Sequence, residues 1–222
     1  MQKIAWEGGS VELLVERAER LLQSDRRSVL GIAGAPASGK STLASGLLSE
    51  LQGRHPGAVV LVGMDAFHIG HRLLAERGLV GIKGAPETFD VGGYVALLKR
   101  ITATDTTIYA PEFHREIEDS LAQTVEIGPS VRLVITEGNY LLLPTHPWNE
   151  VRPLLDEAWF VYLSDSERQQ RMIARHMSFG HSVEAATTRA LGSDELNAVL
   201  INSQQNSVDV WIEHQISTPR NA

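Results

Sequence analysis

Nine consecutive residues have the types and the spacing needed to bind a triphosphate. Residues 34–42 read Gly-Ala-Pro-Ala-Ser-Gly-Lys-Ser-Thr and fill every fixed position of the pattern Gly-x-x-x-x-Gly-Lys-Ser/Thr. Glycines in this pattern let the backbone turn its N–H groups toward a phosphate, the lysine reaches the outer phosphates, and the next hydroxyl binds Mg²⁺. The N-terminus of the following helix attracts the same anion. We therefore expect a nucleoside triphosphate to contact Gly34, Ala35, Ala37, Ser38, Gly39, Lys40, Ser41 and Thr42.

A phosphate-binding loop must lie between a buried strand and a helix, and the flanking sequence predicts both. An apolar run at 28–33 precedes the loop, and leucines at helical spacing follow it over 43–51. Further strands are predicted at 58–62, 106–109, 124–127, 131–136, 158–163 and 208–212. Further helices are predicted at 10–22 with Ser10 as the cap, 94–101, 166–177, 183–191 and 195–201, and a long loop or broken helix at 64–93.

This alternation of strands and helices predicts the fold class. Strands that alternate with helices pair in parallel through right-handed crossovers. We expect an α/β fold, a three-layer sandwich around a central, mostly parallel sheet, with residues 1–222 forming a single domain.

Two carboxylates follow predicted strands and are candidates for metal binding and for accepting a proton. Asp65 comes after the strand at 58–62, and Glu137 comes directly after the strand at 131–136. Ligands bind beyond the carboxyl ends of parallel strands, so both side chains are expected to share a crevice with the phosphate loop. Phosphoryl transfer needs charge neutralisation and an oriented nucleophile. One carboxylate is therefore expected near the metal, and the other as a proton acceptor.

Composition excludes several other functions. The formal net charge of −7 argues against a surface that coats nucleic acid, which needs clustered basic residues. No apolar run approaches the roughly 18 residues that span a bilayer, and the first residues lack the pattern of a signal peptide. Without cysteine there is neither a disulfide nor a thiolate metal site, which fits a cytoplasmic protein. We expect no nucleic-acid or membrane partner, and Mg²⁺ held through the nucleotide as the metal.

Three further motifs resemble a known family. They are residues 64–68 (Met-Asp-Ala-Phe-His), 83–90 (Lys-Gly-Ala-Pro-Glu-Thr-Phe-Asp) and 137–142 (Glu-Gly-Asn-Tyr-Leu-Leu). Together with the phosphate loop they resemble the phosphoribulokinase and uridine kinase family, and the second motif is especially similar to bacterial type I pantothenate kinase. The chain as a whole, over about residues 28–213, is similar to small bacterial kinases labelled fructose transport system kinases. The resemblance implies a P-loop NTPase fold and phosphorylation of a small-molecule hydroxyl by Mg-ATP.

The resemblance also implies roles for individual residues. Asp65 would accept the proton of the substrate hydroxyl, Glu137 would assist at Mg²⁺ or substrate, and Lys40 and Ser41 would hold the phosphates and the metal. Residues 109–115 resemble the family's substrate-side hairpin. The implied substrate-binding residues are His68, Lys83, Tyr109, Phe113, Arg115 and Asn139.

Three arginines are expected on a mobile lid. Arg168, Arg171 and Arg175 fall at i, i+3 and i+7, on one face of a predicted helix. The resemblance makes this helix part of a helical lid over about residues 166–192. Arg171 and Arg175 would then act on the transferring phosphoryl group, and Arg168 would bind the nucleotide, since guanidinium groups suit phosphate contacts.

The sequence identifies neither the molecule that accepts the phosphoryl group nor, by itself, the class of P-loop protein. The chain is shorter than type I pantothenate kinases, and its 64–68 motif differs from that of uridine kinases, so a sugar, a nucleoside and a pantothenate-like alcohol all remain candidates. The alternative is a regulatory P-loop protein that binds or hydrolyses nucleotide without an acceptor, or a mechanical ATPase. Against these, the sequence has neither an Asn-Lys-x-Asp nor a Leu-Ser-Gly-Gly motif. A homodimer is the expected form if the protein is oligomeric.

Overall fold

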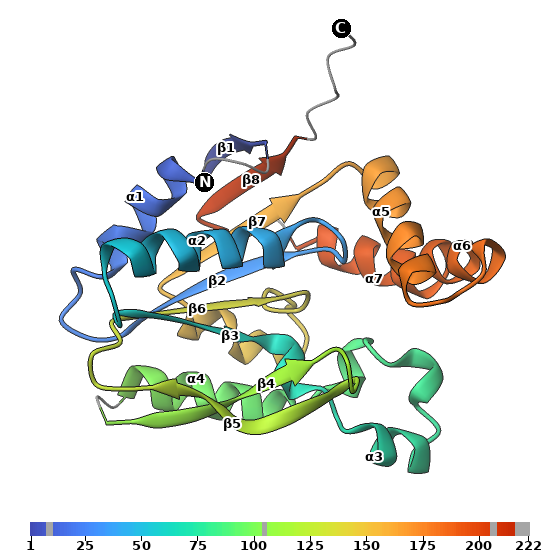
Figure 1. The fold of residues 1–222 in the computed structure, drawn as a ribbon, viewed down its shortest axis with the longest axis horizontal. Helices are drawn as coiled ribbons and strands as arrows, with labels where there is room; N and C mark the ends of the chain where they lie inside the picture. Colours follow the sequence, from blue (N-terminus) through green and yellow to red (C-terminus); the bar gives the residue numbers. More distant parts are fainter. Residues whose placement is uncertain (8–10, 104–105, 205–207, 216–222) are drawn as a thin grey trace, which may run out of the picture.

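A computed structural model describes residues 1–7, 11–103, 106–204 and 208–215 (Figure 1). Within these residues a sheet of six strands occupies the centre, and every neighbouring pair in it is parallel. The spatial order is β1 (Gln2–Trp6), β8 (Val210–His214), β7 (Glu157–Tyr162), β2 (Ser28–Gly34), β6 (Leu133–Gly138) and β3 (Val59–Gly63). The predicted α/β fold is confirmed, and all carboxyl ends of the strands meet at one edge of the sheet.

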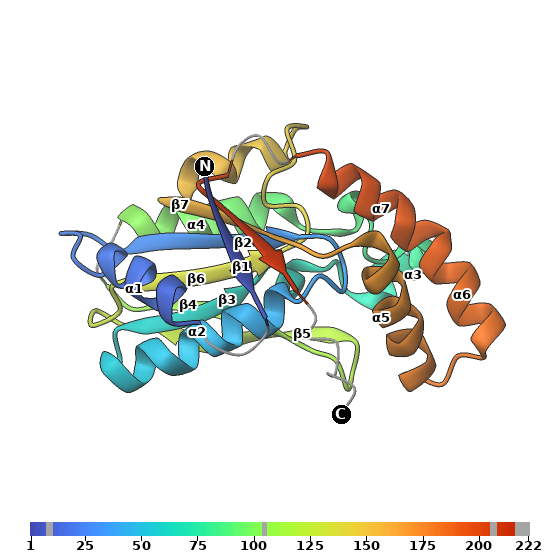
Figure 2. The same ribbon diagram turned by 90° about the horizontal axis from the view of Figure 1, so that it is seen from above.

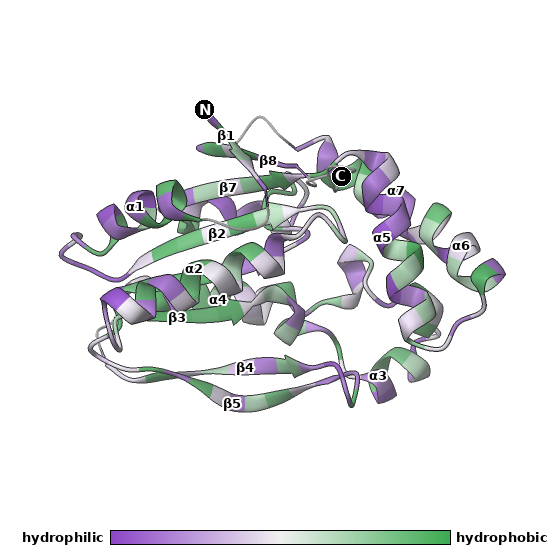
Figure 3. Ribbon diagram, turned by 45° about the horizontal axis from the view of Figure 1, so that its top comes forward, coloured by the Kyte–Doolittle hydropathy of each residue, from purple (hydrophilic) through white to green (hydrophobic). Residues whose placement is uncertain are grey.

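Helices and a hairpin cover the two faces of the sheet (Figures 1 and 2). One face packs on α1 (Glu12–Leu21) and α2 (Lys40–Arg54), whose leucines join apolar residues of β2, β6, β7 and β8 in one core. The other face packs on α4 (Val91–Ala103) and on the antiparallel hairpin of β4 (Ile108–His114) and β5 (Asp119–Ile127). Figure 3 shows the apolar residues that run along β2 and β3 between these layers. Burial on both faces explains the continuous apolar runs of the central strands.

Three helices extend from the edge where the strands end. They are α5 (Asp165–Ser178), α6 (Val183–Leu191) and α7 (Ser193–Asn202), and they lie to the right in Figure 1. A reciprocal cap starts α5: the Ser164 hydroxyl donates to the Glu167 carboxylate at 2.5 Å and accepts the Glu167 N–H at 3.4 Å. None of the helices described is long and apolar enough to cross a membrane.

Most predicted elements are present, with three differences. The structure adds β1 at the sheet edge, which the sequence pattern did not predict. The strands predicted at 106–109 and 124–127 are the base of the longer β4–β5 hairpin. The predicted cap Ser10 lies outside the described residues, and Val11 is the cap residue of α1. Residues 64–93 form the expected broken helical segment, with α3 (His71–Glu76) and short 3₁₀ turns at Met64–Phe67, Val80–Ile82 and Pro86–Thr88. Two further 3₁₀ turns, at Trp148–Glu150 and Arg152–Leu154, lie between β6 and β7.

Candidate active site

The phosphate-binding loop connects β2 to α2 in the geometry that its sequence predicts. Gly39 has φ +101°, a left-handed conformation that strains residues with a Cβ, and it is the residue before α2. Within the described residues, the N–H groups of Lys40, Ser41 and Thr42 have no backbone acceptor. Free N–H groups at the start of a 15-residue helix suit a phosphate.

His214 supports this loop from the last strand. Its Nδ1 lies 2.8 Å from the carbonyl oxygen of Ser38. A Cβ placed on Gly39 would lie 2.6 Å from the same atom, so the ring packs directly on the loop backbone. The Trp6 ring of β1 stacks on His214 with centroids 4.3 Å apart. Burial lowers the pKa of His214, which favours the neutral ring whose Nδ1–H donates to the carbonyl.

We expect His214→Ala to weaken ATP binding about fivefold, because one hydrogen bond to the loop backbone is worth roughly 1 kcal/mol. His214→Asn, which keeps a donor on a short side chain, is expected to lose less. Titration calorimetry with a non-hydrolysable ATP analogue measures both affinities. Equal affinity of His214→Ala and the wild type would show that the strand does not position the loop.

Lys40, Glu137 and Asp65 form a partly buried charged centre beside the loop. Burial lowers the pKa of Lys40, and the charges of Glu137 and Asp65 oppose that change. Burial raises the pKa of Glu137, and the ammonium group of Lys40 opposes it. The Ser41 hydroxyl donates to Glu137 Oε1 at 3.2 Å. The hydroxyl and carboxylate oxygens here suit Mg²⁺, which prefers oxygen ligands.

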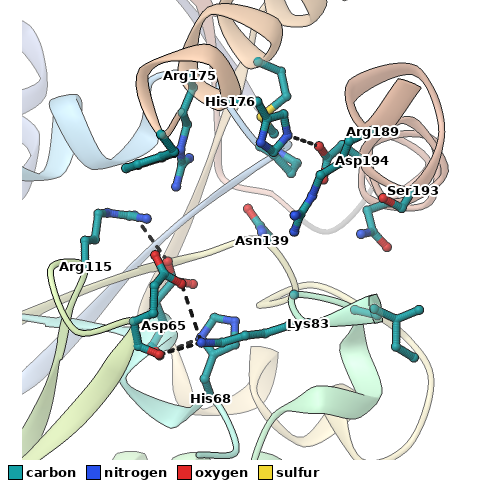
Figure 4. A pocket seen from close by; sticks show the side chains of 18 of the residues that line it. Asp65, His68, Lys83, Arg115, Asn139, Arg175, His176, Arg189, Ser193 and Asp194 are labelled. Carbon is teal, nitrogen blue, oxygen red and sulfur yellow. Dashed lines mark hydrogen bonds and ion pairs between the residues drawn. The ribbon is translucent and has the colours of Figure 1, made fainter. Parts of the chain in front are cut away.

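A cavity of about 610 Å³ opens from this centre toward α5, α6 and α7 (Figure 4). Lys40, Ser41 and Asp65 line its inner end. Arg115 of the β4–β5 hairpin lies 3.5 Å from Asp65 Oδ2. Arg175 of α5 points in from the opposite side, and burial lowers its pKa, as does the charge of Arg115. Two guanidinium groups and an ammonium group thus surround one carboxylate, an arrangement suited to a polyanion.

Rings and a second cation form the wall next to Asp65. His68 Nδ1 lies 2.8 Å from the Asp65 carbonyl oxygen, and the His68 ring packs on Phe89 and Phe113 at centroid distances of 4.0 and 5.2 Å. Burial lowers the pKa of His68, so this ring is neutral at pH 7. Lys83 lies over Phe113, with Nζ 5.4 Å from the ring centroid, and donates to the Glu118 carbonyl at 2.5 Å. The wall offers flat apolar surface with polar edges.

The structure brings many of the predicted residues to this cavity and leaves others outside. Those lining it are Lys40, Ser41, Asp65, His68, Lys83, Phe113, Arg115, Asn139 and Arg175. The Glu137 carboxylate reaches the same centre through Ser41. Of the predicted residues, the cavity lining lacks Gly34, Ala35, Ala37, Ser38, Gly39, Thr42, Tyr109, Arg168 and Arg171. The loop members among these would contribute backbone groups.

Tyr109, Arg168 and Arg171 do not line the cavity because their side chains contact solvent or other parts of the protein. The Tyr109 side chain is 52% exposed. Arg171 lies 3.5 Å from Nδ1 of His214, on the phosphate-loop side of α5. Residues seven positions apart on a helix are separated by about 10 Å along its axis, so arginines on one face meet different neighbours.

Arg168 is fully buried between α5 and α7. It is 0% exposed, forms an ion pair with Glu195 of α7 and lies 3.4 Å from Asp165. Its partners are carboxylates of the helical segment, which differs from the predicted contact with nucleotide. The sequence pattern showed a basic face but could not show which arginine a neighbouring carboxylate would neutralise.

We expect Arg168→Met to lower the free energy of unfolding by about 2 kcal/mol, because Glu195, whose side chain is 25% exposed, loses a charge-assisted hydrogen bond. The ATP affinity of the folded variant should stay within about twofold of the wild type. Urea unfolding and calorimetry measure the two quantities. A variant as stable as the wild type that no longer binds ATP would restore the nucleotide role.

Several residues that line the cavity were not predicted from the sequence. They are contributed mainly by the three helices and include Met172, His176, Phe179, His181, Arg189, Ser193, Asp194, Leu196 and Asn197. His176 Nε2 lies 2.6 Å from Asp194 Oδ2 and joins α5 to α7. The predicted lid contained some of these positions, but their spacing is that of ordinary helices and carries no motif.

Comparison with known proteins assigns the family. A candidate uridine kinase of Schizosaccharomyces pombe is 31% identical over 214 residues, which cover 92% of this chain and 90% of the relative. The chain belongs to the uridine kinase, pantothenate kinase and phosphoribulokinase family of P-loop kinases. The family resemblance seen in the sequence is thus confirmed, and the protein is a P-loop kinase and hence a phosphotransferase.

Two further members show how far the likeness extends. The crystal structure of a candidate fructose transport system kinase from Silicibacter sp. TM1040 superposes with a TM-score of 0.83 and 32% identity, over 91% of this chain and 98% of that one. A pantothenate kinase of Rhizobium johnstonii is 36% identical over 135 residues, but the match covers 58% of this chain and 40% of that enzyme. No model of a known protein family matches the sequence. The family is therefore shared by proteins named for different acceptors.

Proposed function

We propose that the protein transfers the γ-phosphoryl group of ATP to a hydroxyl of a small molecule. The observation that carries the proposal is the position of Asp65, which lies in one cavity with the lysine and serine of the phosphate loop. A carboxylate there can accept the proton of an alcohol next to the outer phosphate. The cavity volume of about 610 Å³ suits a small acceptor.

The acceptor O–H bond breaks and its proton passes to a carboxylate oxygen of Asp65. A bond forms from the acceptor oxygen to the γ-phosphorus, while the bond from the γ-phosphorus to the bridging oxygen breaks and ADP leaves. Lys40 and Arg175 hold the phosphate oxygens as charge shifts toward the leaving ADP.

The remaining groups position the reactants. The N–H groups of Lys40, Ser41 and Thr42 bind phosphate oxygens. Ser41 and Glu137 fit a Mg²⁺ ion, which when bound would neutralise charge on the phosphates. His68, Lys83, Phe113, Arg115 and Asn139 line the acceptor side of the cavity. The charge of Arg171, 3.5 Å from His214, would favour the neutral His214 ring that supports the phosphate loop. The helical segment from α5 to α7 would act as the lid that excludes water.

A regulatory nucleotide switch is the weaker candidate. Such a protein uses a water molecule to hydrolyse the nucleotide or binds a partner protein, and it needs no pocket for an organic molecule beside the γ-phosphate. Here rings of His68, Phe89 and Phe113 build one wall of that pocket. They favour an organic acceptor.

An ATP-consumption screen tests the proposal. Purified protein, Mg²⁺ and ATP are combined separately with sugars, nucleosides and pantothenate-like alcohols, and ADP formation is followed. ADP formed only in the presence of one acceptor class supports the proposal, when mass spectrometry finds the phosphate ester. ADP formation that no acceptor stimulates would favour the hydrolytic alternative. Sedimentation in the same buffer tests the expected homodimer.

A further inference from the structure

The far wall of the cavity contains groups that the proposed reaction does not use. This wall is formed by α6 and α7, opposite the His68–Phe113 wall, and it carries Arg189, Ser193, Asp194 and Asn197. In Figure 4 the guanidinium group of Arg189 extends into the cavity toward Asn139. A charged side chain that points into a small-molecule pocket is a candidate for binding one end of the ligand.

Arg189 is an exposed residue that lines the cavity, and it has no carboxylate partner within 4.0 Å in the described part of the chain. The nearby acids are occupied instead. Asp194 is held by His176 at 2.6 Å, Glu118 lies 3.5 Å from Lys83, and Asp65 lies 3.5 Å from Arg115. An arginine that faces a pocket without a protein partner, in a chain of net charge −7, favours an anion supplied from outside.

The phosphoryl-transfer centre is served by other cations. The charges that act most on the pKa of Lys40 are those of Glu137, Asp65, Arg175 and Arg115. Arg189 is not among them, and its helix forms the outer part of the cavity. Arg189 thus lies farther from the phosphate loop than Arg115 and Arg175, on the side of the cavity where the unphosphorylated end of an acceptor would extend.

Asn139 adds a second contact between the two ends. Its Oδ1 is buried and has no hydrogen-bond partner among the described residues, although the side chain lines the cavity. A buried carbonyl oxygen without a donor costs free energy, and an acceptor hydroxyl would satisfy it. The two features together suit an alcohol that offers a hydrogen-bond donor to Asn139 and carries a negatively charged end.

We propose that the acceptor is an acidic alcohol, whose carboxylate or phosphate is bound by Arg189 while its hydroxyl faces Asp65. This inference rests on the proposed kinase function. It narrows the candidates among sugars, nucleosides and pantothenate-like alcohols to those that carry a negative charge.

Matched pairs of acceptors test the inference. Each pair has one hydroxyl compound with and one without an acidic group: glycerate and glycerol, gluconate and glucitol, pantothenate and pantothenol, ribose 5-phosphate and ribose, with uridine as a neutral nucleoside. We expect kcat/KM to be at least about 50-fold higher for the acidic member of the accepted pair, as a charge-assisted contact in a pocket implies. The acidic group is a carboxylate in the first three pairs and a phosphate in the fourth, so the accepted pair shows which of the two groups the protein binds.

Variants then assign the preference to the residue. Arg189→Gln should raise KM for the acidic acceptor about 50-fold and leave KM for ATP within about twofold, and Arg189→Lys should recover part of the loss. Arg100→Gln, the same change at an exposed arginine of α4 outside the cavity lining, is the control and should behave as wild type.

The outcomes separate the two proposals. Turnover of a neutral member equal to or above its acidic partner would overturn this inference and leave the kinase function standing. An increase of KM for ATP in Arg189→Gln, without change for the acceptor, would also overturn it. No ADP formation with any acceptor would overturn the proposed function and this inference with it.

Discussion

Asp65→Asn is expected to lower kcat by about 10³-fold or more while the affinity for ATP stays within about threefold of the wild type. The amide has nearly the shape of the carboxylate but cannot accept the proton of the acceptor hydroxyl. Arg115, which lies 3.5 Å from Asp65 in the wild type, loses a partner and remains solvent-accessible, so the fold should persist. Steady-state kinetics with the accepted substrate and calorimetry with an ATP analogue measure the two quantities.

Asp25→Asn is the matched control, since this aspartate is exposed and does not line the cavity. It should have wild-type kinetics. Turnover of Asp65→Asn close to the wild-type rate would remove Asp65 from the reaction. Equal losses of turnover and ATP affinity would instead assign it to the nucleotide.

Lys40→Ala is expected to lower kcat/KM by about 10³-fold, because the outer phosphates lose the ammonium group of the phosphate loop. The same change removes the cation that opposes the raised pKa of Glu137, so the pKa of this partly exposed carboxyl should rise further. We therefore expect a large kinetic loss with only a modest change in the free energy of unfolding.

Coupled-assay kinetics and urea unfolding test both parts of this prediction. Lys99→Ala removes an exposed lysine of α4 that pairs with Glu150, and it should leave the kinetics unchanged. Unaltered kinetics of Lys40→Ala would disprove the phosphate assignment. A loss of folding would show that the charge interaction between Lys40 and Glu137 is needed for stability.

The sheet and its inner site could be predicted because local patterns and one topological rule determine them. The apolar runs that form β2 and β6 are buried on both faces, and the run that forms β3 at the sheet edge is partly buried. The carboxyl ends of the three strands meet at one edge. That rule brings Asp65 and Glu137 to Lys40 from positions far apart in the sequence. β1 was missed because most of its residues are partly or fully exposed, and its existence depends on pairing with β8, more than 200 residues later.

The outer site depends on how α5, α6 and α7 pack, which residue spacing alone does not determine. Arg168, Arg171 and Arg175 share one helical face, yet the first meets Glu195, the second approaches His214 and the third enters the cavity. Arg189 had no motif to mark it. His214 acts on the phosphate loop through a contact across 176 residues. Such roles follow from tertiary contacts between segments distant in sequence.

Transfer of a labelled phosphoryl group shows whether the protein phosphorylates a small-molecule hydroxyl with Asp65 as the proton acceptor. The protein is incubated with ATP carrying ¹⁸O in its γ-phosphoryl group and with a mixture of the candidate acceptors, and the products are analysed by mass spectrometry. We expect one labelled phosphate ester of a small molecule for each ADP formed, at a rate about 10³-fold lower with Asp65→Asn. Label found only in inorganic phosphate would contradict the proposed function.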